Sequence, residues 1–371
     1  MRKRKSNGRP TIADVAFRAG VGAITVSRAL RHPDQVSEAL RKTIGDAVRE
    51  LDYVPNLNAR ALASSHSNVV AVLVPSLTQN IFSDVLRGIY DGVEDSGLRI
   101  EIANTRYNVE VEERQIFEIL RHEPSAIIVS GTEQTAASRK MLENAGCPVI
   151  QIMDITDDPI HKVIGFSHFH AGKAMTQHLL DVGYQRVAFF SGWMNSRSQG
   201  RLAGFVEALE EAGIYDPKLI CEMGNEKPSA SQGSIKDYHQ FSTARMGREL
   251  MLRALENGPR IDAVFCNNDV LALGALFACA SCQVEVPRQM GIAGFNDFDY
   301  MEAAQPAMSS VRIHRWQCGY QAMQAVRNEL NGEPVGERIV DLGFEVVKRG
   351  STDRNGTLGV PPPGDIPFTL S

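Results

Sequence analysis

The sequence predicts a small all-α headpiece with a helix-turn-helix, joined to an α/β core made of two doubly wound parallel-sheet subdomains. Three observations support this fold class. The chain has 371 residues, which is too long for one compact core. Apolar residues recur at helical spacing near the N-terminus, around a glycine-rich turn. From residue 69 onward, short apolar runs alternate with helical patterns.

Basic residues are concentrated at the N-terminus. Residues 1–66 contain 12 Lys and Arg against 6 Asp and Glu, whereas the other 305 residues contain 27 against 38. A basic head on an acidic body indicates that only the head meets a polyanion. Five of the twelve basic residues lie in a basic tail over residues 1–10, so a solvated tail is the alternative explanation.

Residues 11–54 carry the signals of a helix-turn-helix. Thr11 and Asp14 form a capping box for a helix over residues 12–19, and Gly20 to Gly22 supply the turn. A second helix follows over residues 23–30, and its inward side chains are expected to be Val26, Ala29 and Leu30. A third helix, capped by Ser37 and ending near residue 51, closes a small core. The second helix can then enter the major groove, although a three-helix bundle without a DNA role is the alternative.

A hinge helix or linker is expected over residues 55–67. Proline stops the preceding helix, and the alanine-rich run behind it is a good but short helix former. Isolated helices of this length are marginal in water. A plain flexible linker is the alternative.

Residues 68–350 are expected to form the core. Strands are predicted over residues 69–74, 98–103, 126–130, 149–152, 187–190 and 263–266. Helices are predicted over residues 83–96, 111–122, 141–145, 172–182, 200–212, 246–257 and 270–280. This alternation implies parallel sheets with helices on both faces, and the glycines of 291–294 are interpreted as strand-end turns.

Two such halves, with a ligand between the carboxyl ends of their strands, make a core like that of the periplasmic binding proteins. One subdomain is expected over about residues 68–166 and 312–342, and the other over 167–311 and 343–350. The apolar helix at 271–280 is the candidate dimer interface, with interior packing as the alternative. Residues 351–371 are rich in proline and glycine and are expected to be a flexible tail.

Several classes of function find no support in the sequence. Six scattered cysteines do not form a disulfide framework, and neither they nor the histidines form a zinc-ligand series. There is no phosphate-binding glycine loop and no nucleophile elbow, so we expect no enzyme activity, no metal and no cofactor. No apolar run is long enough to span a membrane and no secretory signal is apparent, so a cytoplasmic protein is expected.

The motifs in their order resemble those of the lactose/galactose repressor (LacI/GalR) family of bacterial transcription regulators. The headpiece carries Thr11-Ile-Ala-Asp-Val-Ala, Thr25-Val-Ser-Arg-Ala-Leu and Leu51-Asp-Tyr-Val-Pro-Asn, and the similarity continues to about residue 350. One departure is Gly22, where the family usually has a serine that caps the recognition helix. Pro75 to Phe82, Gly165-Phe-Ser and Asp341-Leu-Gly-Phe look most like the gluconate-operon repressor branch.

The resemblance implies a DNA-binding set in the headpiece and hinge. Ala23, Ile24 and Arg28 take base-reading positions, and the fork of Arg28 suits guanine O6 and N7. Thr25 and Ser27 take backbone positions, and Leu62 matches a wedge residue of a hinge helix in the minor groove. The implied set is Thr11, Ala23, Ile24, Thr25, Ser27, Arg28, Tyr53, Asn56, Ala59 and Leu62.

The resemblance also implies an effector-binding set in the core. Its members are Ser76, Phe82, Asp154, Phe166, Arg201, Asn268, Asn296 and Arg315. Arg201 and Arg315 together can hold a carboxylate, which favours a sugar acid such as gluconate over a neutral sugar. The alternative for Arg315 is an arginine of a crossover strand, paired with an interface carboxylate.

The expected function is a sequence-specific DNA-binding regulator. It is expected to be a homodimeric repressor on a pseudopalindromic operator, released by a small sugar or sugar acid, and to have no membrane partner. An effector that enhances DNA binding is an alternative within this class. A solute-binding receptor of the transport type and a sugar-modifying enzyme are the alternatives outside it.

Overall fold

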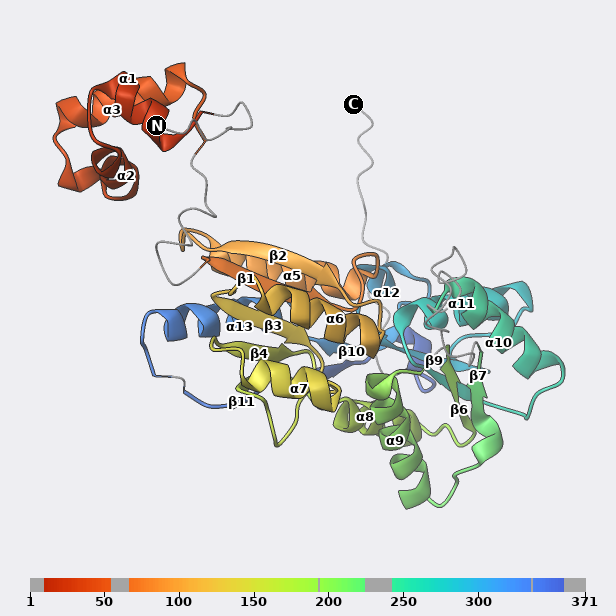
Figure 1. The fold of residues 1–371 in the computed structure, drawn as a ribbon. Helices are drawn as coiled ribbons and strands as arrows, with labels where there is room; N and C mark the ends of the chain where they lie inside the picture. Colours follow the sequence, from red (N-terminus) through yellow and green to blue (C-terminus); the bar gives the residue numbers. More distant parts are fainter. Residues whose placement is uncertain (1–9, 55–66, 193, 224–241, 335, 357–371) are drawn as a thin grey trace, which may run out of the picture. The chain divides into compact units, whose positions relative to one another are not determined.

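The computed structural model describes residues 10–54, 67–192, 194–223, 242–334 and 336–356 (Figure 1). The chain divides into two compact units, Met1–Ser67 and Asn68–Ser371. In the described part of the chain, no helix is long and apolar enough to cross a membrane.

The headpiece is a bundle of α1 (Ile12–Ala19), α2 (Ala23–Arg31) and α3 (Glu38–Glu50), with a short η1 (Pro33–Gln35) before α3. The capping box is present: Asp14 N donates to Thr11 Oγ1 at 3.4 Å, and Thr11 N donates to Asp14 Oδ2 at 2.7 Å. Gly20, at φ 67°, ends α1 in the left-handed conformation that glycine adopts at little cost.

The headpiece has its own apolar core, centred on Val15, Val26 and Ile44. The prediction that Leu30 faces inward is wrong, because Leu30 is 40% exposed. Ala29 takes the inward position, and the next residue lies about 100° further round the helix.

The first subdomain of the core has a six-stranded parallel sheet in the order β11-β5-β4-β3-β1-β2 (Figure 1). Its strands are β1 (Val69–Val74), β2 (Arg99–Asn104), β3 (Ala126–Ser130), β4 (Val149–Ile152), β5 (Lys162–Gly165) and β11 (Ile339–Asp341). Its helices are α5 (Asn80–Val93), α6 (Val109–Leu120), α7 (Ala136–Glu143) and α13 (Arg315–Leu330).

The second subdomain has a six-stranded sheet in the order β12-β10-β9-β8-β6-β7. Its strands are β6 (Val187–Ser191), β7 (Ile220–Glu222), β8 (Ala263–Cys266), β9 (Gly291–Asn296), β10 (Ser309–Ile313) and β12 (Phe344–Val347), and β12 alone pairs antiparallel. Its helices are α8 (His168–Asp181), α9 (Ser196–Glu211), α10 (Ala244–Glu256), α11 (Asp269–Ser281) and α12 (Asp299–Ala303), with the short η2 (Pro217–Leu219).

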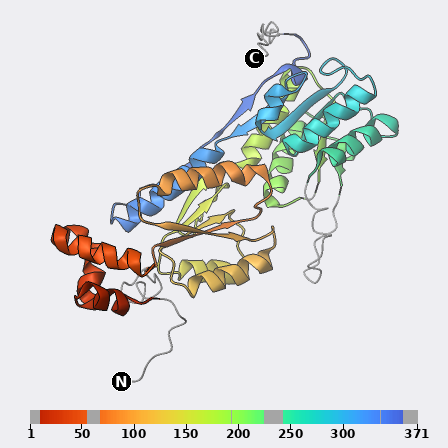
Figure 2. The ribbon, with the colours of Figure 1, turned by 90° about the horizontal axis from the view of Figure 1, so that it is seen from above.

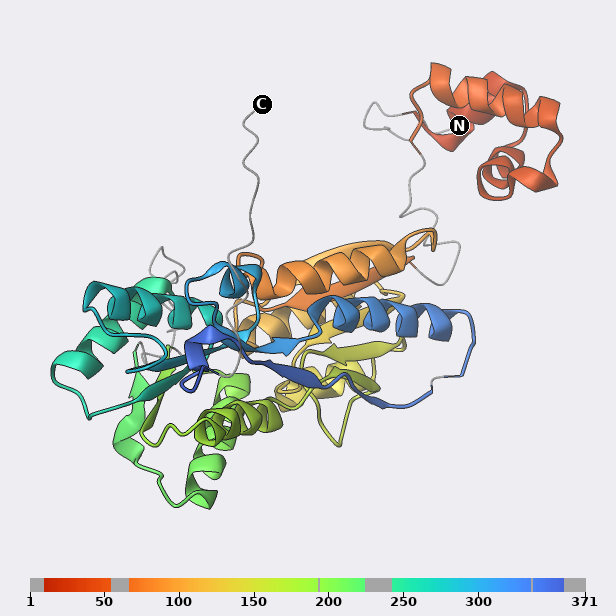
Figure 3. The same cartoon turned by 180° about the vertical axis from the view of Figure 1, so that it is seen from behind.

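Alternate residues of each central strand pack on opposite faces of its sheet, as the doubly wound fold requires. In β1, Val70 and Val72 belong to the cluster with α5 and α13, whereas Ala71 and Leu73 belong to the cluster with α6 and α7. In β6, residues 187 and 189 pack toward α8 and α9, and residues 188 and 190 pack toward α10 and α11. The views from above and behind show these layers (Figures 2 and 3).

The chain passes between the two subdomains three times. It leaves the first sheet after β5, returns from β10 into α13, and crosses again from β11 to β12. The crossings therefore lie at residues 165–167, 313–315 and 341–344. The first and third crossings lie side by side, because Leu342 N donates to Gly165 O at 2.8 Å.

The interpretation of the glycines at 291–294 as strand-end turns is wrong, because both lie inside β9. A Cβ atom on Gly291 would be 2.5 Å from the ring of Tyr184, and one on Gly294 would be 2.4 Å from Asp269 Oδ1. These glycines allow close packing against the sheet and do not serve a turn.

The apolar helix α11 is packed mainly inside the chain. Leu271, Ala275 and Cys279 have no exposed surface, although Phe277 is 52% exposed. Burial raises the pKa of the Cys279 thiol to about 12, which leaves it unreactive. Interior packing, the alternative given for this helix, therefore describes most of its side chains.

The expected flexible tail does not begin at residue 351. The short helix η4 (Gly350–Thr352) is packed against the second subdomain, and Ser351 and Thr352 are fully buried. Ser309 N donates to Ser351 Oγ at 2.8 Å, and His178 Nε2 lies 2.8 Å from Thr352 Oγ1. These hydrogen bonds satisfy buried polar groups, which a prediction from composition does not take into account.

We predict that Ser351→Ala destabilises the core by about 1–3 kcal/mol, because it leaves the buried N–H of Ser309 without an acceptor. Asn355→Ala, at an exposed position four residues further on, is the matched control and should change stability by less than about 0.5 kcal/mol. Urea unfolding of the full chain measures both, and equal stability of the two variants would contradict the packed C-terminal segment.

Candidate DNA-reading face and effector pocket

Helix α2 exposes the side chains that are predicted to read DNA. Ala23, Ile24 and Arg28 are exposed, with Ile24 at 78%, while Thr25 and Ser27 are half-buried. Val26, on the opposite side of the helix, is fully buried and fixes α2 on the headpiece core. Gly22 is the N-cap and supplies no side-chain hydrogen bond, in keeping with its departure from the usual serine.

The other predicted DNA-binding residues lie in different environments. Thr11 is exposed at the start of α1, whereas Tyr53 is only 9% exposed and packs in the headpiece core. Asn56, Ala59 and Leu62 lie outside the described residues.

Polar residues of the predicted effector pocket follow the carboxyl ends of strands in both sheets. Ser76 follows β1 and Asp154 follows β4, while Asn268 follows β8 and Asn296 ends β9. In parallel α/β sheets, ligands bind at this end of the strands. The three crossings bring the two sets of strand ends toward one junction between the subdomains.

Arg201 of α9 is the centre of the junction on the side of the second subdomain. It is 8% exposed, its Nε donates to Asn267 Oδ1 at 2.7 Å, and its Nη2 donates to Ser198 Oγ at 3.1 Å. Its guanidinium lies over the ring of Phe295, 4.3 Å from the centroid. Desolvation, reinforced by the neighbouring charge of Arg197, lowers the pKa of Arg201.

Aromatic rings join Arg201 to the first subdomain. The His168 ring lies 4.4 Å from the Phe166 ring and 5.8 Å from the Phe295 ring, between centroids. Its Nε2 lies 3.1 Å from Met153 O, next to Asp154. Burial lowers the pKa of His168, with help from Arg201 and Arg197, so the ring is neutral.

Asp154 faces the same arginines from the first subdomain. Desolvation raises the pKa of this half-buried carboxyl group, while Arg197, the N–H of Ile155, Thr132 and Arg201 oppose the shift. Asp154 is thus an acceptor opposite two cations, at the junction where a ligand is expected.

Three other predicted residues are engaged in supporting the fold. Ser76 Oγ accepts from the N–H groups of Thr78 and Gln79, both at 3.2 Å. Phe82 is 1% exposed in the core, and Asn268 caps α11 by accepting from Leu271 N at 3.1 Å. Their direct roles toward an effector stay predictions.

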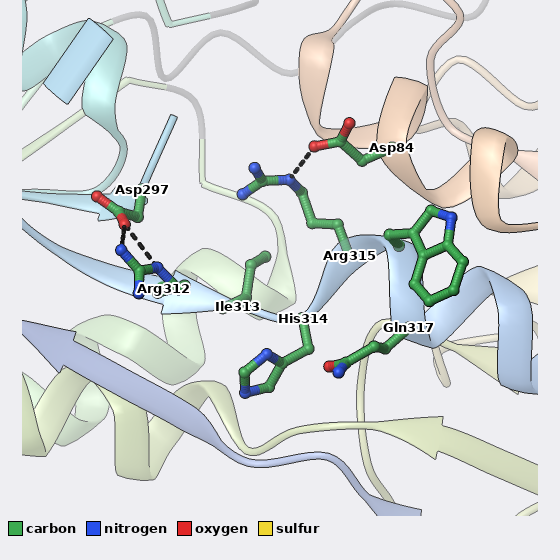
Figure 4. A pocket seen from close by; sticks show the side chains of 8 residues that line it. Asp84, Asp297, Arg312, Ile313, His314, Arg315 and Gln317 are labelled. Carbon is green, nitrogen blue, oxygen red and sulfur yellow. Dashed lines mark hydrogen bonds and ion pairs between the residues drawn. The ribbon is translucent and has the colours of Figure 1, made fainter. Parts of the chain in front are cut away.

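Arg315 is tied to both subdomains. Its Nε donates to Asp84 Oδ2 of α5 at 2.9 Å, its Nη1 donates to Asn296 O, and its guanidinium lies 4.6 Å from the Phe298 ring centroid. Figure 4 shows Arg315 directed to Asp84, while His314 and Gln317 point the other way. These residues line an open pocket of about 350 Å³. The alternative given for Arg315, pairing with an interface carboxylate, matches this arrangement.

Asn296 is a strained residue at the end of β9. Its φ of 113° is unusual for a residue other than glycine, and such strain is concentrated at functional sites. Its side chain is 6% exposed, and within the described residues Oδ1 has no hydrogen-bond partner. This oxygen can accept a hydrogen bond from a ligand hydroxyl group.

Sequence reasoning missed Arg197, His168 and Asn267 at this junction. The signal for Arg197 was its spacing of four residues from Arg201, which places both side chains on one face of α9. Asn267 directly precedes the predicted Asn268. His168 gave no such signal, because its role depends on rings distant in the sequence.

Comparisons with known proteins agree with this architecture. Residues 11–56 match the family described as bacterial regulatory proteins, lacI family, and residues 176–352 match the periplasmic binding protein-like domain. The transcriptional regulator GntR of Pseudomonas aeruginosa is 38% identical over 94% of this chain and 97% of its own. GntR of Escherichia coli K12 is 33% identical over 92% of this chain and 98% of its own.

Solved structures give the same result. A LacI-family regulator from Silicibacter pomeroyi is 33% identical, with a TM-score of 0.83 over 93% of this chain and 100% of that one. The lac repressor dimer bound to operator, at 24% identity and a TM-score of 0.77 over 93% of this chain and 99% of that one, shares the fold.

The fold and the matches define a DNA-binding transcription regulator. This chain belongs to the LacI family of bacterial regulatory proteins. Its relatives in that family are named as transcription regulators.

Proposed function

We propose that the protein is a transcriptional repressor that is released from its operator when a small sugar or sugar acid binds, and that a gluconate-like acid is the favoured effector. One observation carries this proposal: the same chain has an exposed helix α2 that bears Arg28 and a core in which polar residues at the strand ends meet at one junction. The similarity over almost the whole length to regulators named GntR supports both parts.

On the DNA side, Arg28 contacts a guanine and Ala23 and Ile24 make apolar contacts to neighbouring bases. Thr11, Thr25, Ser27 and Tyr53 contact the DNA backbone in this proposal, although Tyr53 is only 9% exposed. Asn56, Ala59 and Leu62 belong to the same proposal as hinge residues in the minor groove.

The protein acts as a homodimer in this proposal, because two headpieces related by twofold symmetry read the two halves of a pseudopalindrome. The lac repressor, which shares the fold, is named as a dimer on its operator. Operator DNA lies in the bacterial cytoplasm, and the protein is proposed to act there.

On the effector side, Asp154, Asn296 and Arg201 offer acceptors and donors that suit the hydroxyl groups of a sugar. Phe82, Phe166, Asn268 and Ser76 shape the pocket around them, and Arg315 joins its two halves. An effector changes operator affinity through unequal affinity for two arrangements of the subdomains.

We expect Arg28→Ala to weaken operator binding by about 1–3 kcal/mol and to relax the base preference at one position of each half-site, because a bidentate contact to guanine is lost. Arg41→Ala, at an exposed position of α3, removes the same charge and should keep the base preference. Fluorescence anisotropy on an operator obtained by in vitro selection, with single base-pair changes, measures both. Unchanged selectivity of Arg28→Ala would show that α2 does not read DNA through this residue.

We expect D-gluconate or a related sugar acid to raise the melting temperature of the full chain and to release it from the selected operator. Neutral sugars and nucleobases are the comparison ligands in the same thermal-shift screen. If only a neutral sugar raises the melting temperature, the effector is a neutral sugar and not a sugar acid. Tighter operator binding in the presence of the acid would contradict the proposed direction of control.

A further inference from the structure

We propose that Arg197 binds the carboxylate of the effector, while Asp154 on the opposite subdomain accepts hydrogen bonds from its hydroxyl groups. This inference rests on the proposed function, because it assigns roles within the same effector pocket. It replaces the expectation from the sequence that Arg201 and Arg315 hold the acid.

Arg315 is poorly placed to bind an anion, because protein groups already surround its guanidinium. Asp84 accepts from Nε, Asn296 O accepts from Nη1, and Phe298 covers one face. A ligand carboxylate would have to compete with the carboxylate of Asp84, which lies 2.9 Å from Nε. A ligand carboxylate on the same guanidinium would lie close to Asp84, and the two negative charges would repel each other.

Arg201 is similarly engaged. Three of its nitrogen atoms approach Asn267, Ser198 and His168, the last at 3.4 Å, and Phe295 covers one face of the guanidinium. These contacts hold the side of the second subdomain together. Arg201 therefore offers an anionic ligand its positive charge more than a free pair of hydrogen-bond donors for a carboxylate.

Arg197 has the free donors. It lies one turn before Arg201 on α9, is half-buried, and forms no ion pair with any residue that the structure describes. Among the described residues, its direct hydrogen bond is from Nη2 to Ser130 Oγ, at 3.2 Å. The planar guanidinium therefore keeps most of its donors for a carboxylate, which it can bind through two parallel hydrogen bonds.

The position of Arg197 joins the two subdomains. Ser130 ends β3 of the first subdomain, and a Cβ atom on the adjoining Gly131 would lie 3.2 Å from Arg197 Nη2. Glycine at this point lets the guanidinium approach the strand end closely. A ligand held by Arg197 would therefore contact the site where α9 meets the first sheet.

The surrounding carboxylates fix the orientation of a sugar acid. Asp154, Glu112 and Glu133 are all close enough to Arg197 for their charges to attract it. Unlike Asp84 at Arg315, none of them forms a direct ion pair with Arg197 among the described residues, so its guanidinium stays open to a ligand carboxylate. A carboxylate placed against these acidic groups would be repelled, whereas ligand hydroxyl groups can donate to them. The anionic end of the ligand therefore belongs at Arg197 and the hydroxyl-bearing end at Asp154.

Isothermal titration calorimetry of the full chain with two probes tests this assignment. D-Gluconate carries the carboxylate, and D-glucitol has the same chain of hydroxyl groups with a hydroxymethyl group in its place. We expect Arg197→Gln to weaken gluconate binding about 10- to 100-fold and to abolish the preference for gluconate over glucitol, because charge-assisted hydrogen bonds are lost. Asp154→Asn should weaken both probes by a similar factor.

Arg253→Gln is the matched control, since Arg253 is an exposed arginine of α10 in the same subdomain and pairs only with Glu249 among the described residues. It should bind both probes as the wild type does. Arg197→Lys keeps the charge but not the fork, and a partial loss of gluconate affinity is expected. If Arg197→Gln unfolds at a lower temperature than the wild type, the gluconate affinity of Arg197→Lys tests the assignment instead.

Wild-type gluconate affinity in both Arg197 variants would overturn the assignment and leave the sugar-acid effector intact. A wild-type protein that binds its operator but no sugar acid would overturn the effector class and this assignment together. The two failures are thus distinguished by the wild type alone.

Discussion

The three crossings between the two sheets constrain everything else in the core. Because the chain passes at residues 165–167, 313–315 and 341–344, the carboxyl ends of both sets of parallel strands face one junction. A ligand at this junction is surrounded by residues of both subdomains. Any relative motion of the subdomains has to be absorbed by these short connections.

Arg315 shows how closely the second crossing is coupled to both sides. It directly follows the linking residue His314, and it joins Asp84 of α5 to the end of β9. Directly after β9, within the second subdomain, Asp297 is held by Arg312 at 2.8 Å and by Arg349. A change in the angle between the subdomains would therefore disturb the partly buried Arg315–Asp84 ion pair, which salt screens less than an exposed pair.

The junction itself brings together charged groups of both signs. Arg197 and Arg201 face Asp154, Glu133 and Glu112, and desolvation raises the pKa of Glu112 to about 7, with Gln134 and Arg197 opposing the shift. An anionic effector adds a charge to this group and has to be oriented by it. This provides a physical reason for discrimination between an acid and the corresponding neutral polyol.

The sequence predicted the parts of the fold that depend on local pattern. The first helix of the headpiece, β1 and β3 have the predicted bounds, because capping residues and continuous apolar runs specify them. The glycine-containing strand β9 was missed, because its glycines allow close packing of Tyr184 and Asp269, which are distant in the sequence. The contacts of Ser351 and Thr352 depend on Ser309 and His178 in the same way.

The candidate site was predicted in part. Four of its predicted members lie around the junction, namely Asp154, Phe166, Arg201 and Asn296. They could be predicted because motifs that resemble those of the family mark the ends of their strands and helices. The engagement of Arg315 by Asp84, a partner 231 residues away, could not be read from either segment alone. The free donors of Arg197 likewise become apparent only when the partners of the other arginines are known.

In the proposed mechanism, operator and effector bind one protein at separate places and oppose each other through its core. The most direct test is to measure the affinity of the full chain for D-gluconate with and without saturating operator DNA. Thermodynamic linkage requires the operator to weaken gluconate binding by the same factor as gluconate weakens operator binding. Equal gluconate affinity in the free and operator-bound protein would contradict this mechanism.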